Sequence, residues 1–95
     1  IFCMNDLMAG GCYDWADESG IKIPQEISVA GYDNRELSSY YKPPLSTTEL
    51  PLHDIGYRAA EVMIGLVEKK SGETAEPQVY KVPCKQLIRQ SIKTL

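Results

Sequence analysis

The sequence is poor in the residues and motifs that mark most catalytic sites. It has a single histidine, three cysteines and one tryptophan in 95 residues. It contains no nucleophile elbow, no dinucleotide-binding glycine motif, no phosphate-binding loop and no zinc-protease motif. His53 falls in the predicted first turn of a helix, where a solvated surface role is favoured over that of a general base. We therefore predict binding rather than catalysis, with no enzyme activity, metal or cofactor.

Positive charge is also scarce. Ten Lys and Arg residues stand against thirteen Asp and Glu residues, which gives a formal net charge of −3 and an isoelectric point near 5.0. A protein surface that binds nucleic acid uses cationic side chains, which release counterions from the phosphates. This segment is therefore not expected to hold DNA itself. No apolar run approaches the ~20 residues of a membrane-spanning helix, so no membrane partner is expected.

The cysteines give no sign of a disulfide framework or a zinc site. Cys3, Cys12 and Cys84 are odd in number and show no CxxC spacing. Cys3 and Cys12 fall on strand and helix positions that are predicted to be buried. Three reduced cysteines in a cytosolic protein are the favoured interpretation.

Two short apolar runs each end in a polar cluster. The run at residues 1–4 leads into Asn5, and the run at residues 27–31 leads into Asp33. Runs of this length predict buried strands, so both clusters fall at the carboxyl ends of strands. Ligands bind at that edge of open α/β sheets. Asn5 and Asp33 are therefore the first candidates for a ligand site.

Strand and helix patterns alternate along the chain, which favours a parallel α/β sheet. The first helix is expected to begin at an Asn5 or Asp6 cap, to end near residue 18 before Gly20, and to bury one apolar face. A brief helix capped by Asn34 is expected over residues 35–41, and an extended segment over 46–49. The longest helix is expected over 52–69, a polar turn over 71–77 and final strands over 79–83 and 86–89. The apolar face of the first helix is expected to hold Met8, Gly11, Cys12 and Trp15.

Four segments resemble, in order and with similar spacing, motifs of the LacI/GalR family of bacterial transcription regulators. The segment NDLMAGG at residues 5–11 is similar to their NDxMAxG, and GIKIPQEISVAGYDN at 20–34 resembles their G-[LI]-x-[VI]-P-x-[DE]-[IL]-S-[VI]-x-G-[FY]-D-[ND] stretch. PPLST at 43–47 resembles PPLTT, and LIRQS at 87–91 resembles LIxRxS. Each motif is weak alone, but four in register over the whole chain are specific.

The resemblance implies a periplasmic-binding-protein-like fold in which two parallel α/β subdomains enclose a ligand cleft. Residues 1–47 are then expected to form part of the carboxy-terminal subdomain. Residues 48–77, with the long helix at 52–69, are expected in the amino-terminal subdomain, and residues 78–95 return to the first. A helix-turn-helix headpiece that contacts operator DNA is expected to precede this segment and not to be part of it.

The resemblance also implies a function, namely a cytoplasmic repressor that responds to a small-molecule effector, a sugar or related metabolite, and works as a homodimer. By position, Asp33 and Asn5 match residues that contact the effector in sugar-responsive members. Local alternatives stay open for both, because Asn5 also suits a helix cap and Asp33 a turn. The alternative function is that of a periplasmic sugar-binding protein of a transporter, and a doubly wound enzyme ranks third.

Two further expectations come from the same resemblance. Many members carry a polar Gln where this chain has Leu50, so Leu50 and Leu52 are expected to form an apolar wall of the effector site or to join the core. Tyr40 and Tyr41 occupy positions where relatives place residues of the subunit interface, and the helix that carries Gly10 is expected near the same face, so Gly10 is counted with them. A core role for one of the two tyrosines is an equal alternative.

Overall fold

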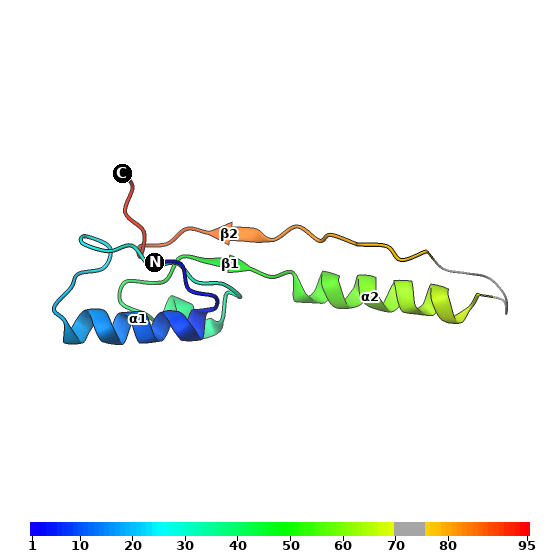
Figure 1. Ribbon diagram of the computed structural model, residues 1–95, viewed down its shortest axis with the longest axis horizontal. Coiled ribbons are helices and arrows are strands. Elements are labelled where there is room, and N and C mark those ends of the chain that lie inside the picture. The colour runs from blue at the N-terminus through cyan, green and yellow to red at the C-terminus, as the bar shows by residue number, and fades with distance from the viewer. Residues whose placement is uncertain (70–75) are drawn as a thin grey trace. The chain divides into compact units, whose positions relative to one another are not determined.

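The computed structural model describes residues 1–69 and 76–95. The chain divides into two compact units (Figure 1): unit 1 contains residues 1–50 and 84–95, and unit 2 contains residues 51–83. The part of the polar turn predicted at residues 71–75 lies outside the described residues. Among those that are described, no helix is both long enough and apolar enough to cross a bilayer.

Unit 1 is built on extended segments that lie side by side in parallel. Residues 1–3 run beside residues 28–33 through a bridge between Phe2 and Ala30, and Ala30 pairs in parallel with Ser46. The predicted strands at the first two segments are thus present as isolated bridges, in the parallel direction that the sequence predicted. This order brings the carboxyl ends of the segments to one edge.

One antiparallel pair completes the sheet of unit 1. Strand β1 (Thr47–Glu49) pairs with β2 (Lys85–Leu87), with Thr47 opposite Leu87. The strand predicted at residues 79–83 is not formed, and this prediction was wrong. That segment belongs to unit 2, which contributes no strand within its described residues.

Helix α1 (Asp6–Glu18) follows the first extended segment. The Asn5 side chain caps it, because its Oδ1 accepts a hydrogen bond from the Met8 amide at 2.8 Å. Gly20, with a φ of +70°, ends the helical run in the left-handed conformation that glycine adopts without strain. The helix, its cap and its stop agree with the sequence prediction.

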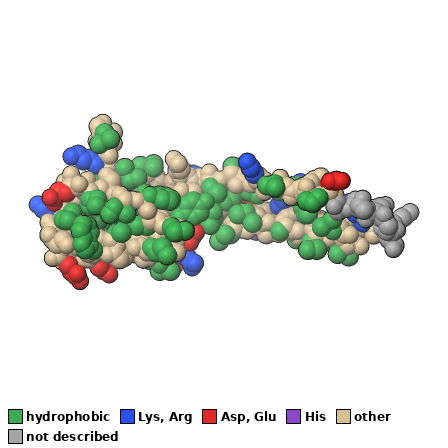
Figure 2. Space-filling view, in the orientation of Figure 1, with side chains coloured by type: hydrophobic (Ala, Val, Ile, Leu, Met, Phe, Trp, Pro, Cys, Tyr) green, Lys and Arg blue, Asp and Glu red, His purple; other side chains and the backbone are tan. Residues whose placement is uncertain are grey.

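The buried face of α1 differs from the predicted one. Ala9 and Ala16 are buried, whereas Met8 and Trp15 are 57% and 47% exposed. The helix is thus turned by about one residue, ~100°, from the expected orientation. Small alanine side chains let the helix backbone approach the sheet, and the larger apolar side chains remain on the surface. Figure 2 shows hydrophobic side chains over the visible face of unit 1.

A short 3-10 helix, η1 (Glu36–Ser39), takes the place of the brief helix predicted over residues 35–41. Its N-cap is Arg35, without a side-chain hydrogen bond, so the predicted Asn34 cap is wrong. Asn34 instead has a φ of +54°, and its Oδ1 accepts a hydrogen bond from Arg89. Its side chain is therefore already engaged away from the helix.

The core of unit 1 is small and is joined by buried polar groups. Leu45 is fully buried and packs with Cys3, Ala9 and Val29. The buried Ser91 hydroxyl donates to the Val29 carbonyl at 2.6 Å. The same hydroxyl oxygen accepts a hydrogen bond from the backbone amide of Ser46, the residue after Leu45. The carboxy-terminal motif is therefore part of the core of unit 1.

Unit 2 consists of helix α2 (Leu52–Val67) and the extended segment that follows the undescribed residues. The predicted long helix is thus confirmed, with its end two residues earlier than expected. Helix α2 has no buried residue. The Arg58 guanidinium lies over the Tyr80 ring, 4.7 Å from its centroid, and this contact joins the helix to the extended segment.

Candidate ligand-binding site

The two polar loops predicted to bind ligand lie together at one edge of unit 1. The Asp6 amide donates a hydrogen bond to the Tyr32 carbonyl at 3.0 Å, which ties the turn after Asn5 to the turn that contains Asp33. Both turns follow parallel extended segments. The edge that the strand pattern indicated therefore does gather these loops.

Asp6 is the residue that holds this edge together. Its carboxylate is fully buried, and Oδ1 accepts from the Thr47 hydroxyl at 2.6 Å. Oδ2 accepts from the Arg35 amide, also at 2.6 Å. A β-carbon at Gly31 would collide with Asp6 Oδ1, which explains the glycine there. A buried carboxylate needs such partners to offset the loss of its hydration.

Sequence reasoning considered Asp6 only as an alternative helix cap and missed this role. The two partners lie 29 and 41 residues further along the chain. No local pattern connects residues so far apart. The one available signal is the position of the carboxylate, directly after the capping Asn5 and directly before an apolar helix.

Asp33 has an unusual backbone conformation for a residue with a side chain. Its φ is +100°, while its amide donates to the Thr48 carbonyl at 2.9 Å. Such conformations cost roughly 1–3 kcal/mol and persist where the surrounding structure fixes them, often at functional sites. The Asp33 side chain is 26% exposed, and its Oδ2 lies 3.8 Å from Arg35 Nε. Its carboxylate oxygens thus remain able to accept hydrogen bonds from a ligand.

Arg89 holds the side chain of Asn34, the residue that follows Asp33, by a hydrogen bond. Its Nη2 donates to Asn34 Oδ1 at 3.0 Å, and its Nη1 donates to the Leu45 carbonyl at 2.8 Å and to Ser38 Oγ at 2.9 Å. The guanidinium fork matches these three acceptors and holds the turn against the core. The carboxy-terminal motif contains this arginine, but nothing in the motif's local pattern predicts its contacts with residues 34, 38 and 45.

Asn5 is half-buried, and one of its two polar atoms is already used. Its Oδ1 caps α1, whereas its Nδ2 has no hydrogen-bond partner among the described residues. The capping role is therefore confirmed, and the amide nitrogen is left as a donor. The contact of Asn5 with an effector stays a prediction.

The three residues expected at a subunit interface have different environments. Tyr40 is 69% exposed. Tyr41 stacks on Tyr13 with ring centroids 4.8 Å apart, and its hydroxyl donates to the Asp6 carbonyl at 3.0 Å. A β-carbon at Gly10 would lie 2.7 Å from that hydroxyl, so Gly10 and Tyr41 are close neighbours. Tyr41 thus has contacts within its own unit, and the interface stays a prediction.

Leu50 and Leu52 fall on either side of the boundary between the two units. Leu50 is half-buried in unit 1, and Leu52 is 68% exposed in unit 2. Their predicted role as an apolar wall of the effector site stays a prediction.

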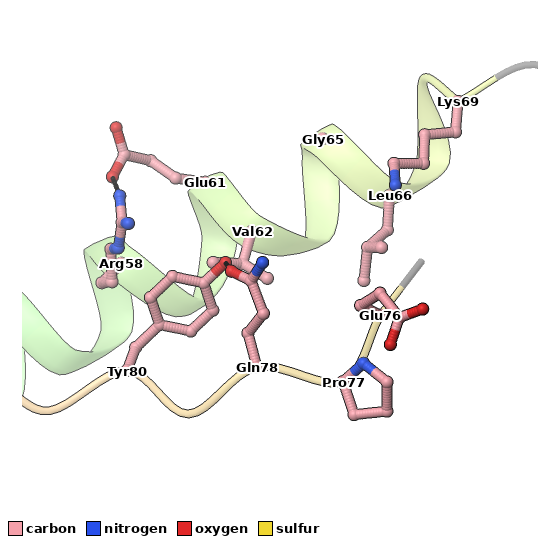
Figure 3. Close-up of a pocket in the computed structure, with 10 residues that line it drawn as sticks. All are labelled: Arg58, Glu61, Val62, Gly65, Leu66, Lys69, Glu76, Pro77, Gln78 and Tyr80. Atoms are coloured by element: carbon pink, nitrogen blue, oxygen red, sulfur yellow. Dashed lines mark hydrogen bonds and ion pairs between the residues drawn. The ribbon is translucent and has the colours of Figure 1, made fainter. Parts of the chain in front are cut away.

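A cavity of about 550 Å³ lies within unit 2, and none of the predicted site residues lines it. Figure 3 shows Arg58, Tyr80 and Gln78 along it, with the Tyr80 hydroxyl donating to Gln78 Oε1 at 2.7 Å. Its walls are one helix and one extended segment, both of which are largely exposed. The edge of unit 1 is the better candidate, because buried groups fix its polar side chains in place.

Comparison with known proteins gives the family of the chain and several similar proteins. Residues 1–92 match the family described as periplasmic binding protein-like domain. The chain is similar to the HTH-type transcriptional repressor PurR of Vibrio atlanticus, with 39% identity over 95 residues. That alignment covers 100% of this chain and 28% of that protein, so the chain spans little more than a quarter of this curated relative.

Solved structures show the same likeness. A LacI family transcriptional regulator from Enterococcus faecalis with bound ribose superposes with a TM-score of 0.79 at 33% identity, over 97% of this chain and 33% of that chain. The lac repressor dimer, bound to operator and the anti-inducer ONPF, gives a TM-score of 0.80 at 28% identity, over 96% of this chain and 30% of that chain. These similarities confirm the partial periplasmic-binding-protein-like α/β fold that the sequence predicted.

Proposed function

Because the chain belongs to the periplasmic binding protein-like domain family, we propose that it forms part of the effector-binding domain of a LacI/GalR-type transcriptional repressor. Asp33 and Asn5 contact the effector in this proposal, and operator DNA is bound by a helix-turn-helix outside the chain. The protein works in the cytoplasm as a homodimer and catalyses no reaction. Effector binding shifts the population between a state that binds operator DNA and one that does not.

The observation that supports this proposal best is the state of the Asp33 carboxylate. It is held on a backbone in the left-handed region and is only 26% exposed, and within residues 1–69 and 76–95 its one ion-pair contact is with Arg35, at 3.8 Å. A carboxylate so placed accepts two hydrogen bonds from a ligand, and charge-assisted bonds are stronger than neutral ones. The free Nδ2 of Asn5 adds a donor on the adjoining loop.

This pair of groups fits a small ligand that carries both donors and acceptors. Sugar hydroxyls donate and accept, and the N–H groups of a purine-type base donate to a carboxylate. The structural neighbour from Enterococcus faecalis, which holds ribose, supports the sugar class. The PurR and lac repressor relatives support the regulator over the periplasmic transport protein.

A thermal-shift screen on the natural-length protein tests the proposal, with ribose and a purine base as the first probes. A ligand at 100 times its dissociation constant stabilises a protein by about 2.7 kcal/mol. We expect one of the two classes to raise the melting temperature, and that ligand to change binding to operator DNA in a gel-shift assay. Turnover of the ligand would contradict the proposal and support an enzyme. Binding without any DNA complex would support the transport protein.

A further inference from the structure

Two free thiols lie in contact inside unit 1. The Sγ atoms of Cys3 and Cys12 are 3.4 Å apart, although the residues are nine positions apart in the chain. A disulfide joins sulfurs at about 2.05 Å, so the pair needs to close by little more than an ångström. We propose that Cys3 and Cys12 form an oxidisable dithiol, which a hydroperoxide converts into an intramolecular disulfide. This proposal goes beyond effector binding and does not depend on it.

The surroundings of the two thiols give them different roles. Cys3 lies in the core at 7% exposure, and burial raises its pKa to about 11, so it remains a protonated thiol at neutral pH. The hydrogen bond with Cys12 acts in the same direction, which is consistent with Cys3 as the donor. Cys12 is half-buried on α1 and is therefore the thiol that an oxidant reaches first.

The chemistry proceeds in two steps. Cys12 first loses its proton. The thiolate then attacks the outer oxygen of the hydroperoxide, the O–O bond breaks, and Cys12 becomes a sulfenic acid, while the departing alkoxide or hydroxide takes up a proton and leaves as an alcohol or water. The Cys3 sulfur then attacks Cys12 Sγ, the S–O bond breaks, and the Cys3 proton leaves with the hydroxyl group as water. In total, two thiols lose two protons and two electrons, and one hydroperoxide takes up both to become an alcohol and water.

The disulfide would tie the first extended segment to α1. Cys3 belongs to the segment that leads into Asn5, and Asn5 caps the helix that carries Cys12. Disulfides in reducing compartments are usually transient and redox-sensing, which fits a pair that is free in the structure and closes only on oxidation. The exposed Cys84 contacts neither thiol; its Sγ lies 3.8 Å from the Tyr32 hydroxyl. Cys84 therefore provides an internal control.

The test is thiol mapping of the natural-length protein after treatment with a small excess of hydrogen peroxide. The treated and untreated proteins are denatured, alkylated with N-ethylmaleimide and mapped by mass spectrometry. We expect Cys3 and Cys12 of the treated protein to carry no maleimide and to appear as one linked peptide pair, while Cys84 appears in no linked peptide. A thiol reductant should restore both sites. Full alkylation of Cys3 and Cys12 after peroxide, or a link through Cys84, would overturn the proposal.

Single Cys→Ser variants show which of the two thiols reacts with the peroxide first. Cys3→Ser should leave Cys12 as a sulfenic acid that dimedone traps, and Cys12→Ser should leave Cys3 as a free thiol. Cys84→Ser should form the Cys3–Cys12 link as the wild type does. If Cys3→Ser fails to fold, the mapping of wild type and Cys84→Ser still decides the proposal. Dimedone trapped on Cys3 of Cys12→Ser would overturn the assigned roles.

Discussion

Units 1 and 2 each contain a helix that the sequence predicted, but among the described residues the buried core side chains all belong to unit 1. In unit 1, Leu45 is fully buried, and the buried carboxylate of Asp6 has two hydrogen-bond donors. In unit 2, no residue of α2 is buried, and the Arg58–Tyr80 contact lies on the surface. The comparison shows that an apolar stripe predicts a helix without identifying the surface that it packs against.

The same difference decides where a specific site can form. A ligand-binding side chain needs neighbours that hold its position. Asp33 has such neighbours, since Asp6 holds the Arg35 amide and Arg89 holds Asn34. The cavity of unit 2 has no buried polar group to support it among the described residues. Preorganisation, and not cavity size, therefore favours unit 1 as the binding site.

The largest expected loss of stability comes from the core of unit 1. Leu45→Ala should lower the free energy of unfolding of the natural-length protein by about 2–5 kcal/mol, the range for emptying a fully buried leucine site. The control is Val67→Ala, which alters an α2 side chain that is 75% exposed. This variant should change the free energy of unfolding by no more than ~0.5 kcal/mol. Urea denaturation measures both. Equal losses would break the comparison between the units.

The second prediction concerns the exposed tyrosine of unit 1. If Tyr40 lies at the proposed homodimer interface, Tyr40→Asp places a charge in an apolar contact and should weaken the dimer tenfold or more, or by at least ~1.4 kcal/mol. Sedimentation at micromolar concentration measures the change. The matched control is Tyr57→Asp on α2, at 63% exposure. An unchanged dimer in Tyr40→Asp would place the interface elsewhere.

Replacing a glycine by alanine should lower the stability of the protein in α1 and raise it in α2. Gly10→Ala puts a β-carbon 2.7 Å from the Tyr41 hydroxyl, which is held by its bond to Asp6, and should cost about 1–3 kcal/mol. Gly65→Ala meets no atom within 4 Å and should stabilise α2 by about 0.5–1 kcal/mol. Thermal unfolding measures both. A destabilising Gly65→Ala would show that α2 is covered on that face.

The smallest effect concerns pH. Burial raises the pKa of Tyr13 from 10.0 to about 12, and its hydroxyl donates to the Pro43 carbonyl at 2.7 Å. Between these pH values the folded chain binds more protons than the unfolded chain, so the free energy of unfolding should fall as the pH rises from 10 to 12. Tyr13→Phe should make that fall shallower. Parallel curves for wild type and variant would contradict the assignment.

The local parts of this fold could be predicted from the sequence. The Asn5 cap and the Gly20 stop of α1 depend on residues close in the chain, and so does the periodicity of α2. The two loops at the sheet edge were also located correctly, because each ends a short apolar run. Local chemistry is sufficient for such features.

The remaining features depend on contacts between distant residues. The buried face of α1 holds Ala9 and Ala16, and Ala9 packs with Val29 and Leu45, a tertiary contact that helical periodicity does not specify. The Arg89–Asn34 hydrogen bond joins residues 55 positions apart, and it engages the side chain that was predicted to cap η1. The positive φ of Asp33 likewise depends on its tertiary contacts.

The most direct test of the central claim is calorimetric titration of Asp33→Ala with the effector that the thermal-shift screen identifies. Loss of two charge-assisted hydrogen bonds, each worth about 1.5–3 kcal/mol, should reduce affinity by about a hundredfold or more. Operator binding without effector should change little, and the exposed Asp14→Ala on α1 should keep wild-type affinity. Wild-type affinity in Asp33→Ala would contradict the account and leave Asp33 as a turn residue only.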